Sequence, residues 1–257
     1  MTHFSDLKEI NKNQFFDIEY LLSIKNNIIN GNIYVLRSAF NSSKLKNIFR
    51  KIYNDRNEPT ENTKMVEGVG NIFYKSNFSG KGQYTTNDYS WYFFPWNTDQ
   101  SGLSNLMQPY FNQIILMNEY DPKIIINNTP KDKIIQRMQL IYYPLGSGHI
   151  SLHKDPVNIT KVTCGVYITE FGRDYDEGGF YVYNSKKEKV FIDHKINSGD
   201  LILFYNGLFH GVDTVLKNNA TNKKDEELFG RSFLNLSLIE SHEVQNRQTT
   251  VGIRKID

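Results

Sequence analysis

The chain has 257 residues, of which 39% are hydrophobic and 23% charged, values that are ordinary for a globular protein able to bury a sizeable core. Thirty basic residues against twenty-eight acidic ones leave a net charge of +2, which argues against nucleic acid or an anionic membrane as the main partner. The single cysteine, Cys164, excludes an internal disulfide and a cysteine-based zinc cluster.

The first residues, MTHFSDLKEI, have neither the basic segment nor the apolar stretch of a signal peptide. The sequence contains no run of about eighteen apolar residues, the length that would predict a membrane span. We therefore expect a cytoplasmic protein without a membrane partner.

Two helices and a short strand are predicted near the start of the chain. Residues 13–30 have apolar side chains at helical spacing, and Gly31 is a suitable stop. A β-like run follows at 32–40. Residues 42–55, SSKLKNIFRKIYND, then predict a capped amphipathic helix with one apolar face.

The segment 66–100 is rich in glycine and aromatic residues and ends in YSWYFFPWN. Aromatic side chains this dense usually fill a core, but tyrosine and tryptophan also line pockets because they combine apolar bodies with polar tips. We expect some of them on the substrate side. Residues 101–120 predict one more helix.

From Ile134 onward the pattern becomes β. Turn residues separate six short apolar runs: IIQRMQLIYY, KVTCGVYITE, GGFYVYN, KVFIDHKI, DLILFYN and RSFLNLSLIE. Closely spaced strands without helices between them favour an antiparallel sandwich or jelly roll. We predict one α+β domain over 1–257, comprising a mainly helical part (1–130) packed on one face of a jelly-roll core (131–242), and a tail (243–257).

The stretch GSGHISLHKDP contains a candidate metal site. On a strand, residues two apart point to the same side, so His153 and Asp155 aim at one point. A third ligand is available in His210, just past the apolar strand of SGDLILFYNGLFHGVDTV. Two imidazoles and one carboxylate form the facial triad of non-haem iron oxygenases, which leaves coordination positions open. His149 and His194 are competing ligands.

Between about Gln139 and Ile239 the chain resembles the Fe(II)/2-oxoglutarate (2OG)-dependent oxygenase superfamily, with a pattern closest to its prolyl-4-hydroxylase-like members. The matching segments are YYPLGSGHISLHKDP, GGFYVY, SGDLILFYNGLFHGVDTV and GRSFLNLSL. The resemblance implies a double-stranded β-helix (a cupin-like jelly roll), Fe(II) held by the three ligands above, and 2OG and O2 as cosubstrates. It also implies hydroxylation of an unactivated C–H bond of a small molecule or an amino-acid-like or peptidyl substrate, with release of succinate and CO2.

By the same resemblance, Arg231 would bind the far carboxylate of 2OG, a role that suits a guanidinium fork. Tyr143 lies near a position where such enzymes place a tyrosine on the cosubstrate. It is one residue farther from the first metal ligand than that pattern, so Tyr142 competes for the role. A related branch has Arg-X-Ser at this arginine, whereas here Ser232 and Phe233 follow it.

Candidate substrate contacts are His149, and Asp174, Asp176 and Glu177 of the acidic turn RDYDEGG, which could meet a substrate amine or belong to a solvated loop. The polar spacer LKNNATNKKDEELF before Arg231 predicts an exposed loop, either a plain connection or a lid over the substrate. The alternatives to the oxygenase are a cupin-like metal isomerase, a keto-acid-independent dioxygenase and a non-catalytic jelly-roll binding module.

Overall fold

The computed structural model describes residues 2–56, 72–78, 86–97, 99–125, 129–218 and 230–246. Its strands are β1 (Leu7–Ile10), β2 (Ile33–Leu36), β3 (Ile72–Phe78), β4 (Thr86–Phe93), β5 (Ile134–Pro144), β6 (His149–His153), β7 (Val162–Tyr167), β8 (Glu177–Tyr183), β9 (Lys189–Phe191), β10 (Leu201–Tyr205), β11 (His210–Leu216) and β12 (Gly230–Glu240). Its helices are α1 (Lys12–Phe16), α2 (Ile18–Ile29), α3 (Ser42–Asn54), α4 (Leu103–Met117) and α5 (Pro122–Ile125), with 3-10 turns η1 (Pro130–Asp132) and η2 (Asp193–Lys195).

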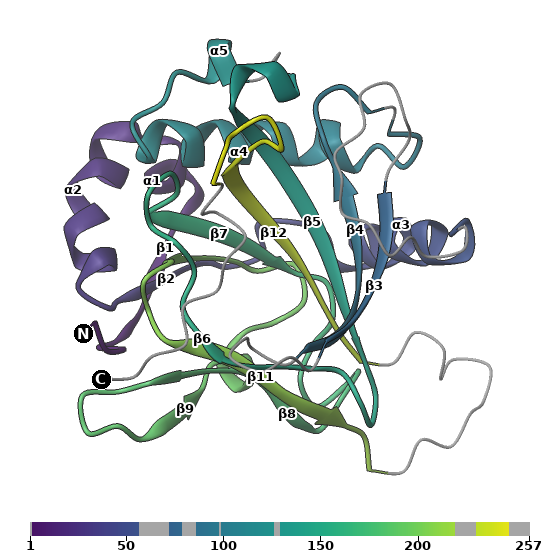
Figure 1. Ribbon diagram of the computed structural model, residues 1–257. Helices are drawn as coiled ribbons and strands as arrows, with labels where there is room; N and C mark the ends of the chain where they lie inside the picture. The colour runs from purple at the N-terminus through teal and green to yellow at the C-terminus, as the bar shows by residue number, and fades with distance from the viewer. Residues whose placement is uncertain are drawn as a thin grey trace.

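The strands form two layers (Figure 1). The major sheet has the order β1-β2-β10-β7-β12-β5-β4, with β3 paired to β4, and the minor sheet has the order β6-β11-β8-β9. Strand β4 also pairs with β6 and so joins the two sheets. The predicted jelly roll is confirmed, and its interior is the space between the sheets.

The alternation of side chains along the strands shows which residues lie on each face of the major sheet. In β12, Leu234, Leu236 and Leu238 belong to the core on the helix side, whereas Phe233 belongs to the core between the sheets. Successive side chains of a strand point to opposite faces, so Arg231 and the other odd-numbered residues of β12 face the interior. The same parity holds in β5, where Tyr142 faces the helices and Tyr143 the interior.

Helices α2, α3 and α4 cover the outer face of the major sheet, as predicted for the N-terminal part. The expected continuous helix over 13–30 is divided at Asp17, because the carboxylate of Asp17 accepts hydrogen bonds from the backbone N–H of Glu19 (3.0 Å) and Tyr20 (3.2 Å) and caps α2. The capped helix predicted over 42–55 is present as α3, with Asn41 as its N-cap.

The N-terminal part also contributes strands. Part of the aromatic-rich segment forms β4, which lies beside β5 in the major sheet. The run KVFIDHKI is a strand only as far as Phe191, after which η2 turns the chain.

Cys164 is buried, and burial raises the pKa of its thiol, as fits a packing residue.

In the part of the chain that the structure describes, no helix is both long and apolar enough to cross a bilayer. Most of the predicted lid, residues 219–229, lies outside the described residues, as does the tail beyond residue 246.

Candidate metal centre

Strand pairing brings the three predicted ligands together. Strand β6 ends at His153, β11 begins at His210, and these residues are direct partners in the antiparallel ladder. Asp155 follows two residues after the end of β6, where its backbone N–H donates to the carbonyl of Asn206 at 2.9 Å. The ligands are therefore positioned by the minor sheet and by a backbone contact to the end of β10.

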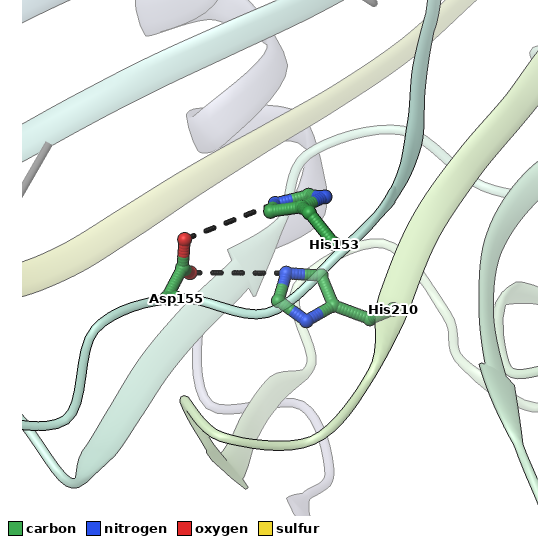
Figure 2. Close-up of side chains that lie close together, drawn as sticks. All are labelled: His153, Asp155 and His210. Atoms are coloured by element: carbon green, nitrogen blue, oxygen red, sulfur yellow. Dashed lines mark ion pairs between the residues drawn. The ribbon is translucent and has the colours of Figure 1, made fainter. Parts of the chain in front are cut away.

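The three side chains converge on one point (Figure 2). The Nε2 atom of His153 lies 3.8 Å from Oδ1 of Asp155, and the Nε2 atom of His210 lies 3.7 Å from Oδ2 of the same carboxylate. All three ligand atoms lie within 4.8 Å of one another. The imidazoles are nearly buried, whereas the side chain of Asp155 is 36% exposed, so the cluster has one open side.

Backbone carbonyls orient both imidazoles. Nδ1 of His153 lies 2.8 Å from the carbonyl oxygen of Ser151, and Nδ1 of His210 lies 2.8 Å from that of Leu208. A carbonyl oxygen only accepts, so Nδ1 carries the proton in each neutral ring and Nε2 presents a lone pair. This outer hydrogen bond is the usual way in which a metal-binding histidine is held.

The donor set fits a divalent transition metal. Such ions contact nitrogen and oxygen ligands at about 2.0–2.2 Å, so two ligand atoms of one ion lie within roughly 4.4 Å of each other. Both distances to Asp155 meet this limit. Two imidazoles and a carboxylate on one side of an ion, with an open side opposite, are the composition that suits non-haem Fe(II).

The competing histidines lie elsewhere. His149 has Nδ1 2.9 Å from the carbonyl of Ser147, and His194 packs against the rings of Phe171 and Phe191. Neither belongs to the group of possible metal ligands found among the described residues. A substrate contact by His149 stays a prediction.

Arg231 is 2% exposed and forms a buried ion pair that the sequence did not reveal. Its Nε lies 2.7 Å from Oδ2 of Asp193, and its Nη2 donates to Oδ1 of the same carboxylate (3.3 Å). Asp193 also accepts hydrogen bonds from the hydroxyls of Tyr167 (2.7 Å) and Tyr175 (2.6 Å) and from the backbone N–H of Phe180 (2.8 Å). Nη1 of Arg231 has no hydrogen-bond partner among the described residues.

This environment keeps Arg231 charged. Burial disfavours the charged form, but the neighbouring Asp193 outweighs it and the pKa of Arg231 is raised well above its ordinary value. Burial, reinforced by the Asp193 charge, also raises the pKa of the Tyr167 and Tyr175 hydroxyls. Both tyrosines therefore remain hydrogen-bond donors to Asp193.

Phe180 links the two parts of the interior. Its ring centroid lies 5.7 Å from that of His210 and 5.7 Å from the guanidinium carbon of Arg231. Tyr143 also faces this space, with its ring 5.6 Å from the same guanidinium carbon. Tyr142 lies on the helix side, where its ring packs 5.6 Å from that of Phe49. Of the two competing tyrosines, only Tyr143 shares a face with Arg231.

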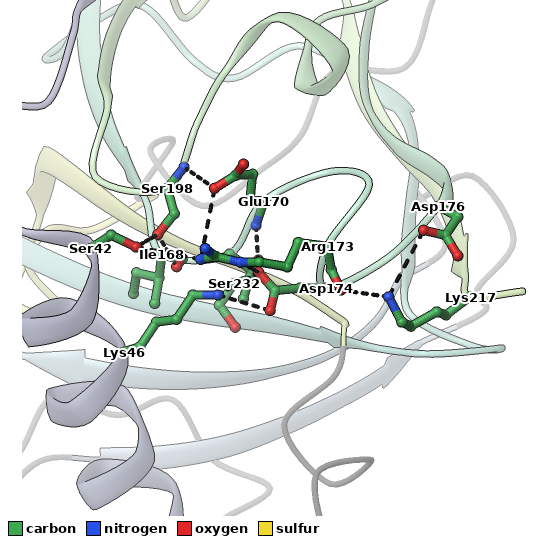
Figure 3. A network of polar contacts seen from close by, with 11 residues as sticks. Ser42, Lys46, Ile168, Glu170, Arg173, Asp174, Asp176, Ser198, Lys217 and Ser232 are labelled. Atoms are coloured by element: carbon green, nitrogen blue, oxygen red, sulfur yellow. Dashed lines mark hydrogen bonds and ion pairs between the residues drawn. The ribbon is translucent and has the colours of Figure 1, made fainter. Parts of the chain in front are cut away.

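The acidic turn is largely occupied by structural contacts (Figure 3). Both carboxylate oxygens of Asp174 accept hydrogen bonds from Nζ of Lys46 (2.8 and 2.6 Å), which ties the turn to α3. Asp176 accepts from the backbone N–H of Asn218, and Glu177 accepts from the Asn218 side chain. Contacts of these residues with a substrate stay a prediction.

Sequence reasoning missed two buried carboxyl groups. Asp193 lies in KVFIDHKI, a run that its sequence pattern predicts to be a strand, and an aspartate inside an apolar run is the available signal. Asp88, on β4, is 7% exposed and accepts hydrogen bonds from the hydroxyls of Thr86 (3.1 Å) and Ser90 (3.4 Å). Burial raises the pKa of Asp88 to about 7.

The sequence matches no protein-family model and no curated protein. Solved structures nevertheless share its fold. A 2OG-Fe(II) oxygenase-family oxidoreductase from Burkholderia pseudomallei is 14% identical, with a TM-score of 0.52 over 95% of this chain and 99% of that one. A full-length Neurospora crassa protein, in complex with alpha-KG, is 10% identical, with a TM-score of 0.52 over 92% and 86%. JOX2, in complex with 2OG, Fe and JA, is 9% identical, with a TM-score of 0.52 over 98% and 79%.

These similarities confirm the double-stranded β-helix that the sequence resemblance implied. At 9–14% sequence identity, these similarities establish the fold.

Proposed function

We propose that the protein is an Fe(II)- and 2OG-dependent oxygenase that hydroxylates a C–H bond of a small-molecule or amino-acid-like substrate and releases succinate and CO2. The observation that carries the proposal is the convergence of His153, Asp155 and His210, whose Nε2 and carboxylate oxygen atoms lie within 4.8 Å of one another with one side left open. Bound Fe(II) would supply the centre at which a keto acid and O2 react.

The chain's own residues would bind, orient and exclude water. The carbonyls of Ser151 and Leu208 hold the two imidazoles in the ligand tautomer. Arg231 would direct Nη1 to the far carboxylate of 2OG, while Asp193 holds its other two nitrogens in place. The rings of Tyr143 and Phe180 would shield the cosubstrate from water. No side chain is assigned a role as general acid or base.

One observation favours a second candidate, a keto-acid-independent dioxygenase. Asp193 already neutralises the charge of Arg231, so the arginine would attract an external carboxylate less strongly than an unpaired guanidinium. Such an enzyme would use the same metal ligands and would need no carboxylate clamp.

Anaerobic titration with Fe(II), followed by assays of succinate formation and O2 uptake, tests the proposal. Wild type should bind Fe(II) and convert 2OG to succinate. In Asp155→Ala, iron affinity should fall by more than about a hundredfold, since even outer-shell partners of a metal site contribute ten- to a hundredfold. His149→Ala, the matched histidine control in the same segment, should bind iron as wild type does.

Equal iron affinity in wild type and Asp155→Ala would refute the metal site. Iron-dependent O2 uptake without 2OG consumption would instead establish the keto-acid-independent enzyme.

A further inference from the structure

An arginine outside the proposed cosubstrate site faces the same interior. Arg137 lies on β5 with the parity of Tyr143, so its side chain enters the space between the sheets. Its Nε is buried without a hydrogen-bond partner, and its Nη2 donates to Oγ of Ser237 at 3.3 Å. Among the described residues, no carboxylate forms an ion pair with Arg137.

This arrangement is energetically incomplete. A buried guanidinium N–H without an acceptor loses its hydration and gains no hydrogen bond in return, which is costly for a charged group. Asp193 supplies such an acceptor to Arg231, whereas among the described residues the one hydrogen-bond acceptor of Arg137 is the hydroxyl of Ser237. An external anion would supply the missing acceptor.

The metal centre and Arg137 lie at the same level of the barrel. Arg137 is the ladder partner of Ser237 on β12. On its other side, β12 pairs with β7, where Leu236 is the ladder partner of Cys164. Because the two strands are antiparallel, the next residue of β12, Ser237, lies opposite Thr163 of β7. Thr163 pairs with Phe204 on β10, whose ring lies 5.5 Å from that of His210. One inward-facing row thus runs from Arg137 to Phe204, beside His210. Three of its strands, β5, β12 and β7, lie side by side in Figure 1.

Arg137 and Arg231 cannot both bind one small keto acid. Arg231 pairs with Tyr143, six residues beyond Arg137 on β5, so the two backbones stand roughly 20 Å apart along the strands. The ligand of Arg137 is therefore a different molecule from the cosubstrate.

An aromatic ladder stands next to Arg137. The rings of Tyr92 and Phe94 are stacked with centroids 6.4 Å apart, and those of Phe94 and Trp96 are stacked at 5.0 Å. The ring of Tyr92 lies 5.7 Å from the guanidinium carbon of Arg137. Phe94 packs with Ile135 and Ile239 in a small apolar cluster at this end of the sheet.

Neighbouring polar groups complete the surface. Asn235, the ladder partner of Gln139, accepts a hydrogen bond through Oδ1 from Thr163, and its Nδ2 has no partner among the described residues. Gln139 donates to the hydroxyls of Ser90 and Tyr92 and so holds the ladder against β5. Arg137 and Asn235 together can donate hydrogen bonds to the two oxygens of a carboxylate.

We propose that Arg137, Asn235 and the Tyr92–Phe94–Trp96 ladder form the prime-substrate subsite, which takes a carboxylate attached to an apolar or aromatic body. This proposal rests on the proposed function and identifies the class of its substrate. The row from Arg137 to Phe204 crosses three inter-strand steps of about 4.8 Å each, and facing sheets lie about 10 Å apart, so the oxidised carbon stands on the order of 10–15 Å from the carboxylate. Substrates with a free carboxylate at one end and an apolar chain or ring fit this separation.

The test uses three probes, phenylacetate, 3-phenylpropanoate and 4-phenylbutanoate, each compared with its uncharged amide. Binding to the full chain is measured by calorimetry, with Zn(II) in place of Fe(II) and with 2OG present, so that no turnover is needed. At least one carboxylate should bind wild type ten- to a hundredfold more tightly than its amide, as expected for charge-assisted hydrogen bonds.

Arg137→Gln should abolish this preference while the affinity for the amide stays unchanged. Phe94→Leu should weaken the carboxylate and the amide alike. Arg50→Gln, which removes an exposed arginine of α3, is the matched control and should behave as wild type.

Three results would overturn the subsite: no carboxylate preference in wild type, an unchanged preference in Arg137→Gln, or a loss of 2OG affinity in Arg137→Gln without effect on the probes. The last result would make Arg137 the cosubstrate clamp. Failure of the proposed function is seen separately, as a lack of 2OG turnover in the Fe(II)-loaded protein whose probe binding is intact.

Discussion

Two regions of the barrel interior each contain an aspartate, and the two carboxylates differ in their hydrogen-bond partners and in their exposure. Asp193 has a full set of partners: an arginine, two tyrosine hydroxyls and a backbone N–H surround a carboxylate that is 1% exposed. Around Asp155, the carboxylate is 36% exposed and faces two imidazole nitrogens across 3.7–3.8 Å, beyond hydrogen-bond distance. The first arrangement stabilises the fold, whereas the second leaves its bonding capacity for a ligand.

The same substitution at the two sites gives the sharpest test of this difference. Asp193→Ala leaves a buried arginine without its counter-charge and should lower the free energy of unfolding by about 3–5 kcal/mol. Asp155→Ala, measured on metal-free protein, should leave that free energy nearly unchanged. Denaturant titration of both variants provides the comparison.

Because Asp193→Ala could fail to fold, the double variant Asp193→Ala/Arg231→Met accompanies it. Removing both charges should restore much of the stability, since a buried pair can often be replaced by apolar side chains. If Asp155→Ala were as destabilising as Asp193→Ala, the distinction between a structural and a ligand-binding carboxylate would fail.

Asp88 is a buried carboxyl group with no counter-charge among the causes of its pKa shift, so its protonation should make the stability of the protein depend on pH. Its pKa is raised to about 7, because burial disfavours the anion and the Thr86 and Ser90 hydroxyls only partly compensate. Between its ordinary pKa of 3.8 and pH 7 the native state holds a proton that the unfolded chain has lost. Its contribution to stability therefore falls as the pH rises through this interval and is constant above it.

Asp88→Asn keeps the hydrogen-bonding groups and removes the ionisation. It should stabilise the protein at pH 8 by on the order of 2–4 kcal/mol and have little effect at pH 4. Chemical denaturation across this pH range, with exposed Asp55→Asn as control, measures the difference. A stability gain independent of pH would contradict the assignment.

The smallest expected effect concerns the packing beside Arg231. A Cβ atom added at Gly165 would lie 1.7 Å from Cζ of Phe233, whose ring stands 5.0 Å from the guanidinium carbon of Arg231. Gly165→Ala must displace this ring and should cost about 1–3 kcal/mol of stability. Thermal unfolding measures the loss, and Gly165→Ala/Phe233→Leu should recover part of it because the clashing ring is gone.

The cluster of His153, Asp155 and His210 could be predicted because its evidence is local and chemical. His153 and Asp155 have strand spacing, and His210 follows a recognisable apolar strand. The closed network around Arg231 could not be predicted, since Asp193 lies 38 residues away on a turn after β9. Tyr142 and Tyr143 competed on spacing alone, and only the parity of β5 against the two cores separated them.

By itself, the sequence determined the jelly-roll architecture and the composition of the candidate metal site, because alternation and ligand chemistry are properties of short segments. The tertiary structure alone decided which charges find partners. Arg231 and Arg137 are both arginines on strands, but the turn after β9 brings a carboxylate to the first, whereas in the described part of the chain the second has the hydroxyl of Ser237 as its hydrogen-bond acceptor. That difference arises from contacts between segments far apart in the chain, where the pattern of either segment carries no information.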